Sequence, residues 1–71
     1  MYRDENIKLS PNLPKRLQDD IAELEKLYDE DDEFAWMNLM EMIDVDTRAY
    51  IVSGRITQEE GYQVLRRFGW R

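Results

Sequence analysis

The sequence has 71 residues, of which 42% are hydrophobic and 37% charged, with a formal net charge of −6 and no cysteine or histidine. This length allows one small domain, and the apolar and aromatic content is too high for a disordered chain. Without cysteine, disulfides and thiolate metal sites are excluded, and without histidine the usual imidazole base and zinc ligand are absent. We therefore expect no enzyme activity, no cofactor and no metal site.

The start of the chain is polar and irregular. Residues 1–5 contain no apolar run that would form a signal peptide, so we expect a cytoplasmic protein without a membrane span. Pro11 and Pro14 disfavour helical conformation in the residues that precede them. Residues 1–12 are therefore predicted to form an N-terminal arm, which Tyr2, Ile7 and Leu9 could hold against the rest of the chain, and residues 13–71 to form the folded domain.

The first helix is predicted to run from about Pro14 to residues 28–30, with Asn12 as its N-cap. One apolar face is formed by four side chains at spacings of four, three and four: Leu17, Ile21, Leu24 and Tyr28. No glycine marks the end of this helix. The acidic run Asp29–Glu33 follows it instead.

The second helix is predicted to begin after Asp31 or Asp32 as N-cap and to end at Ser53, with Gly54 following. One face carries Trp36, Leu39, Met40, Ile43, Thr47 and Tyr50, and further apolar residues widen it: Ala35, Met42, Val45, Ala49 and Val52. A helix this apolar lies between two others or is covered by a partner. A break at residues 44–46 is an alternative, but we prefer a continuous helix and expect Trp36 to be buried.

The third helix has the clearest local pattern. Thr57 and Glu60 form a capping box, and Gly69 is placed to end the helix so that Trp70 folds back on its last turn. The predicted inner face consists of Tyr62, Leu65 and Phe68. Gly61 indicates either close contact with another backbone or a tolerated weak position, and we favour the second interpretation.

These elements predict an all-α fold, an antiparallel three-helix bundle with a short N-terminal arm. A chain of this length buries only about 60% of the surface of its unfolded state and is marginally stable alone. Self-association is therefore one alternative that the size of the chain leaves open.

The charges are unevenly distributed along the chain. Residues 1–18 carry +2, residues 19–46 carry −11 and residues 47–71 carry +3. The acidic hairpin from Asp19 to Asp46 predicts one protein partner with a basic patch, because such polarity steers association. In the alternative, the opposite charges offset each other within the fold. A basic rim is formed by Arg55, Arg66, Arg67 and Arg71, but we do not expect direct nucleic-acid binding, since only Arg66 and Arg67 would lie on the outer face of the last helix.

Aromatic residues and methionines next to the acidic run are the other candidates for binding. Phe34 and Met37 share a side that is rotated away from the main apolar face, as does Tyr2 if the arm lies nearby, although such residues can also belong to an ordinary core. The candidate partner-binding residues are Asp31, Asp32, Glu33, Phe34, Met37 and Trp70.

The last third of the chain carries a recurring pattern. A helix ending at Ser53 is followed by Gly54-Arg55-Ile56-Thr57-Gln58-Glu59-Glu60, a second helix and Phe68-Gly69. This pattern is similar to the second half of small bacterial antitoxins that restrain Fic-type adenylyltransferase toxins, and it also resembles C-terminal helical hairpins of other bacterial proteins. The antitoxins' inhibitory element, a serine or threonine followed four residues later by glutamate, is absent. The resemblance implies an antitoxin- or inhibitor-like protein.

Three functions fit these observations. The first is a non-enzymatic protein-binding module. The second is a nucleic-acid mimic of the anti-restriction or anti-CRISPR type, which predicts that the carboxylates at positions 19, 23, 30, 33, 41 and 44 are exposed on one continuous surface. The third is a self-assembling structural protein.

Overall fold

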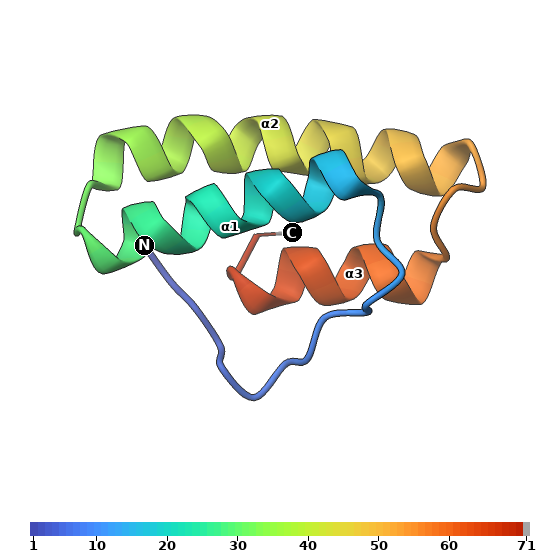
Figure 1. Cartoon of the computed structure of the whole chain (residues 1–71), viewed down its shortest axis with the longest axis horizontal. Coiled ribbons are helices and arrows are strands. Elements are labelled where there is room, and N and C mark those ends of the chain that lie inside the picture. The colour runs from blue at the N-terminus through green and yellow to red at the C-terminus, as the bar shows by residue number, and fades with distance from the viewer. Residues whose placement is uncertain (71) are drawn as a thin grey trace.

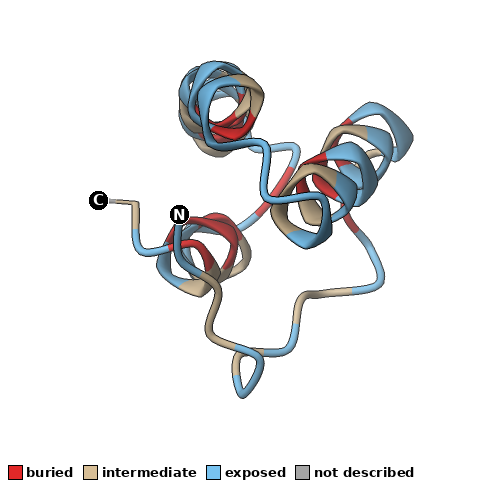
Figure 2. Ribbon diagram, turned by 90° about the vertical axis from the view of Figure 1, so that its left-hand side faces the viewer, coloured by how far each residue is buried: buried red, intermediate tan, exposed pale blue. Residues whose placement is uncertain are grey.

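The computed structural model describes residues 1–70 and contains α1 (Lys15–Asp29), α2 (Glu33–Val52) and α3 (Gln58–Arg67). Helix α1 packs against α2 and α2 against α3, and the chain reverses direction at each turn (Figure 1). The prediction of an all-α three-helix bundle is confirmed. Helix α2 is continuous through residues 44–46, as we preferred. The N-terminal arm runs across the side of the bundle between α1 and α3 (Figures 1 and 2).

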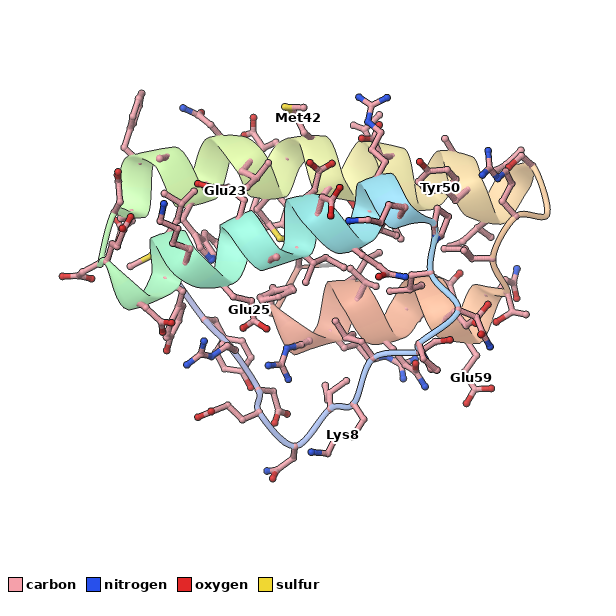
Figure 3. The ribbon with its side chains drawn as sticks, in the orientation of Figure 1. Lys8, Glu23, Glu25, Met42, Tyr50 and Glu59 are labelled. Carbon is pink, nitrogen blue, oxygen red and sulfur yellow. The ribbon has the colours of Figure 1, made fainter. Side chains whose placement is uncertain are left out.

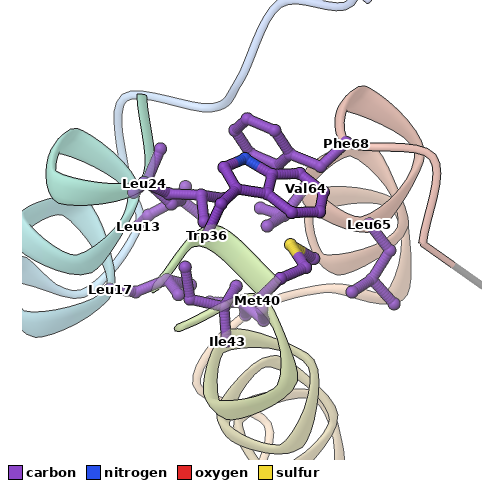
Figure 4. Packing of buried hydrophobic residues seen from close by; sticks show 11 residues of the cluster. Leu13, Leu17, Leu24, Trp36, Met40, Ile43, Val64, Leu65 and Phe68 are labelled. Atoms are coloured by element: carbon purple, nitrogen blue, oxygen red, sulfur yellow. The ribbon is translucent and has the colours of Figure 1, made fainter. Parts of the chain in front are cut away.

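All three helices contribute to one hydrophobic core (Figure 4). Its buried residues are Leu13, Leu17, Ile21, Leu24, Trp36, Met40, Ile43, Ile56, Val64, Leu65 and Phe68. The predicted burial of Trp36 is confirmed, because its side chain is 3% exposed. The inner face predicted for α3 is partly wrong, since Tyr62 is 40% exposed and Val64 is fully buried. Gly61 faces α2 in place of Tyr62, and the tyrosine side chain is turned toward the surface.

Each helix ends in a Schellman motif, in which the residue after the C-cap has a positive φ. These residues are Asp31 (φ 59°), Gly54 (φ 77°) and Gly69 (φ 69°). The N–H of the next residue donates to a carbonyl in the last turn in each case: Asp32 to Leu27, Arg55 to Tyr50 and Trp70 to Leu65. The predicted ends at Gly54 and Gly69 are therefore confirmed, and an aspartate takes the glycine's position at the end of α1.

The starts of α2 and α3 agree with the predicted caps. The Asp32 carboxylate accepts from the Ala35 N–H at 3.2 Å, and Thr57 and Glu60 form both bonds of the capping box. The predicted cap of α1 is wrong. Pro14 occupies the N-cap position, where it has no side-chain acceptor to offer, and Asn12 lies in the preceding turn.

Gly61 lies buried where α3 crosses α2. A Cβ atom at this position would lie 2.7 Å from Ile51 Cγ1 and 3.3 Å from Thr47 Cγ2. The interpretation of Gly61 as a tolerated weak position is therefore wrong. The close neighbours are side chains of α2 rather than another backbone.

Candidate interaction surface

The turn between α1 and α2 is entirely acidic, and we call Asp29–Glu33 the acidic corner. All five of its residues are exposed. Two of them shape the turn: Asp31 adopts the left-handed conformation, which aspartate tolerates better than most residues, and Asp32 caps α2. Local hydrogen bonding thus holds carboxylates at one end of the bundle, next to the positive end of the α2 dipole.

Part of the acidic charge of residues 19–46 is offset within the fold. Ion pairs join Asp19 to Lys15, Glu25 and Asp29 to Arg3, Asp44 to Arg48, and Glu33 to the N-terminal ammonium. Among residues 1–70, Asp31 and Asp32 have no cationic nitrogen within 4.0 Å. The acidic corner therefore keeps charge that a partner can reach.

A surface hollow of about 260 Å³ lies beside the acidic corner. Glu33, Met37 and Trp70, three of the predicted site residues, line it together with Met1, Tyr2, Trp36, Phe68 and Gly69. Tyr2 was not among the candidate partner-binding residues, but the sequence places it on the side of Phe34 and Met37 if the arm lies nearby, and the arm brings it to the hollow. Tyr2 is 52% exposed, Met37 is 46% exposed, and Trp70 is half-buried against the core.

Phe34 does not line this hollow. It projects from the first turn of α2 and is 80% exposed. Two further apolar residues of α2, Val45 and Val52, are 66% and 89% exposed. We call Phe34, Val45 and Val52 the outer row of α2. In Figure 2, α2 is the uppermost helix, its buried residues face the other two helices, and its opposite side is exposed.

The arm is held by a cluster of charged groups that we call the arm clamp: Arg3, Glu25 and Arg67. Glu25 points from α1 toward the arm (Figure 3). Arg67 donates to the carbonyls of Asp4 at 3.2 Å and Ile7 at 2.9 Å, and its Nη2 lies 3.2 Å from Glu25 Oε2. The prediction that Arg67 lies on the outer face of α3 is therefore wrong. The basic rim is smaller than predicted, and Arg71 lies outside the described residues.

Two groups near the arm have perturbed pKa values. The hydrogen bond to Glu25, with nearby Asp29, raises the pKa of the Arg3 guanidinium above its ordinary value. Hydrogen bonds from the Ser10 hydroxyl and the Thr57 N–H lower the pKa of Glu60. Both interactions favour the charged forms and fix the arm to the bundle.

Neither a metal site nor a membrane span emerges over residues 1–70. No group of three or more acidic side chains is arranged to hold a metal ion. None of the helices α1–α3 combines the length and the apolar character that crossing a membrane requires.

Comparisons of the chain with protein-family models, with curated proteins and with solved structures found no match. The acidic corner, the hollow beside it and the outer row of α2 are the surfaces from which a function can be inferred.

Proposed function

We propose that this protein is a small non-enzymatic binding module that holds one protein partner through the acidic corner and the adjacent hollow. The observation that carries this proposal is the juxtaposition of two kinds of group. Asp31 and Asp32 are exposed with no cation within 4.0 Å among residues 1–70, and the hollow beside them is lined by Tyr2, Met37 and Trp70. An apolar anchor surrounded by charge is the arrangement that protein interfaces commonly use.

The partner that fits this surface has a basic patch around one protruding apolar side chain. The apolar side chain would enter the hollow against Met37 and Trp70, and methionine adapts its shape to such a contact. Lysine or arginine side chains of the partner would face Asp31 and Asp32, which sets the orientation and the rate of association. The absence of histidine and cysteine from the sequence supports a role in binding rather than in catalysis.

We include in the proposal that binding inhibits the partner, as the antitoxin resemblance of residues 49–69 implies. An inhibitor of this kind needs only to cover a functional surface. Its effect would therefore depend on the residence time of the complex and would require no residue of the chain to react.

The test begins with purification of a stoichiometric partner from the native host, followed by measurement of association and dissociation rates. The double variant Asp31→Asn/Asp32→Asn removes charge alone, because asparagine also caps helices and tolerates the left-handed conformation. We expect association at low salt to slow by roughly three- to tenfold, and wild-type association to slow similarly in 0.5 M salt. Met37→Ser should instead accelerate dissociation.

The matched control is Glu23→Gln/Glu59→Gln, which removes the same charge from exposed positions on α1 and α3. This control should retain most of the wild-type association rate. Equal slowing by both double variants would show that only the net charge matters, and rates that ignore salt and Met37 would overturn the proposal.

A nucleic-acid mimic is the second candidate. Five of the six carboxylates predicted to form its surface are exposed: Asp19, Glu23, Glu30, Glu33 and Glu41. Asp44 departs from that prediction, because it is half-buried and bonded to Arg48 at 2.7 Å. Competition between this protein and a DNA or RNA duplex for the same partner would favour this candidate over the binding module.

A further inference from the structure

The outer row of α2 consists of three exposed apolar side chains on the side of the helix that faces away from α1 and α3, with Glu41 between Phe34 and Val45 and Arg48 between Val45 and Val52. A helix advances by 100° per residue, so Phe34, Val45 and Val52, separated by eleven and seven residues, point within about 20° of one another. The row extends about 27 Å along the helix. Met42, at its edge, is 51% exposed and projects away from the bundle in Figure 3.

Charges beside the row change sign along the helix. Glu41 is exposed in the first half of α2, and Arg48 follows two turns later. Arg48 lies on the side of the row that faces α3, since it lines the groove between α2 and Tyr62 of α3, and Glu41, seven residues earlier, projects within about 20° of it. The acidic residues of α2 are Glu33, Glu41, Asp44 and Asp46, and its basic residue, Arg48, comes after all of them.

We propose that two copies of this chain associate through the outer rows of α2 in antiparallel orientation. In such a pair the two-fold axis is perpendicular to both helices. It places residues that lie at equal distances on either side of the axis opposite each other, and it keeps them on the same side of the interface. Centred near residue 43, it places Phe34 of each copy against Val52 of the other. With this centre, Glu41 lies about 4.5 Å along the helix axis from Arg48 of the other copy, which is within reach of the long arginine side chain.

The antiparallel orientation follows from charge complementarity. It brings Glu41 of each copy next to Arg48 of the other and puts the bulky Phe34 against the smaller Val52. A parallel pair would place the two Glu41 side chains at one height and the two Arg48 side chains at another, so it would bring like charges closer and form no pair between Glu41 and Arg48. Arg48 already binds Asp44, and its five N–H donors leave room for a second carboxylate.

This inference does not rest on the proposed function, because the acidic corner and the hollow lie beside the row and bind a different molecule. The interface is one helix wide and therefore smaller than the ~800 Å² per partner that is typical of stable complexes. We expect a dissociation constant of roughly 1–100 μM.

Single cysteines test the orientation cleanly, because the chain has no cysteine of its own. With a short bis-maleimide reagent, the Val45→Cys variant should form covalent dimers, since this position lies close to the two-fold axis. Phe34→Cys alone should not, because its copies lie about 27 Å apart, but a mixture of Phe34→Cys and Val52→Cys should. Cross-linking of Phe34→Cys with itself in preference to the mixture would overturn the antiparallel arrangement.

Sedimentation equilibrium of the purified protein tests the interface itself. Val45→Asp should weaken dimerisation by at least tenfold, and Ala22→Asp, at an exposed position in the middle of α1, should not. Glu41→Arg and Arg48→Glu should each weaken it by roughly tenfold, and the double variant should recover most of the affinity. Circular dichroism checks that each variant is folded. A wild-type protein that stays monomeric at about 1 mM, or a double variant no better than the single ones, would overturn the proposal.

Discussion

The turn between α1 and α2 and the turn between α2 and α3 follow the same backbone plan with different residues. In each turn, a Schellman motif ends one helix and an N-cap residue, whose side chain accepts a backbone hydrogen bond, begins the next. The second turn uses Gly54 at the left-handed position and a complete capping box at Thr57. The first uses Asp31 and a single cap bond to Asp32, within five consecutive carboxylates.

The difference indicates that the acidic corner contributes less to the stability of the fold than the turn between α2 and α3. Left-handed backbone costs a residue other than glycine about 1 kcal/mol, and neighbouring like charges repel. The fourth residues of the two following helices also differ: α2 has the large Trp36 and α3 has Gly61, and both are buried. The helix that follows the acidic corner is anchored in the core by Trp36, whereas the helix that follows the second turn makes a close contact with α2 at Gly61.

Removal of the anchor should have the largest effect. Trp36→Ala is expected to lower the free energy of unfolding by about 3–5 kcal/mol, because it leaves a cavity between the helices. This loss is large enough to unfold so small a domain. Circular dichroism with urea denaturation gives the measurement. A Trp36→Ala protein that melts like the wild type would show that the acidic corner needs no anchor.

Exchange of the left-handed residues tests the comparison directly. Asp31→Gly should raise the free energy of unfolding by about 1 kcal/mol, and Gly54→Asp should lower it by about the same amount. No atom lies within 4 Å of a Cβ built at Gly54, so the backbone conformation is the main cost there. Equal effects of the same sign in calorimetry would contradict this account of the two turns.

The close contact at Gly61 should also be measurable. Gly61→Ala gains helix propensity but forces Ile51 to move, and we expect a net loss of about 1 kcal/mol. In an Ile51→Ala background the clash is removed, so the same substitution should become neutral or stabilising. A double-mutant cycle from thermal melts gives the coupling free energy between the two substitutions. A coupling of zero would mean that α2 and α3 can move apart at this point without loss of stability.

The caps offer a smaller contrast. Thr57→Ala should cost about 1 kcal/mol, because it removes an N-cap bond of the capping box. Asp32→Ala should cost about 0.5 kcal/mol, since the lost cap is partly offset by reduced repulsion within the acidic corner. Urea titrations of the two variants, with Thr57→Ser as the control that keeps the bond, would reveal whether both starts are equally stabilised.

The smallest effect concerns pH. The pKa of Glu60 is lowered in the folded protein, so its contribution to stability is complete above the unfolded-state value of 4.5 and is lost as the pH falls through the folded-state pKa. Glu60→Gln should therefore flatten the dependence of the melting temperature on pH below about 4.5. Ser10→Ala should flatten it partly. Glu59→Gln is the matched control, and an identical flattening in this variant would assign the effect to surface charge in general.

Local rules predicted most of the secondary structure. Periodicity and caps placed three helices, the capping box at Thr57 and the ends at Gly54 and Gly69, because these depend on residues within one turn of each other. Asn12 is not the N-cap because α1 begins after Pro14, whose ring restricts the backbone at the start of the helix. Tyr62 was placed on the inner face because the sequence does not show how α3 is rotated against α2.

The candidate surface was less predictable, since it depends on contacts between distant segments. Phe34 and Met37 follow from their position on α2, but Tyr2 joins the hollow only because the arm folds back onto α3. Arg67 carries the same charge as Arg66 and differs from it only in facing the arm. Charge pattern alone could not separate the two arginines.

The arm clamp has a consequence for how the chain folds. The bond from Arg67 to the Asp4 carbonyl joins residues 63 positions apart, whereas the helices and the two turns depend on neighbours in the sequence. Contacts between distant residues require closure of a long loop and therefore form after local ones. We infer that the three helices assemble first and that the arm docks last, which brings residues 2–4 next to residues 67–69. In unfolding the order is reversed, so release of the arm should be the first step. The Asp4 N–H donates to the Arg67 carbonyl, and we expect it to exchange its hydrogen before the amides of the core helices do.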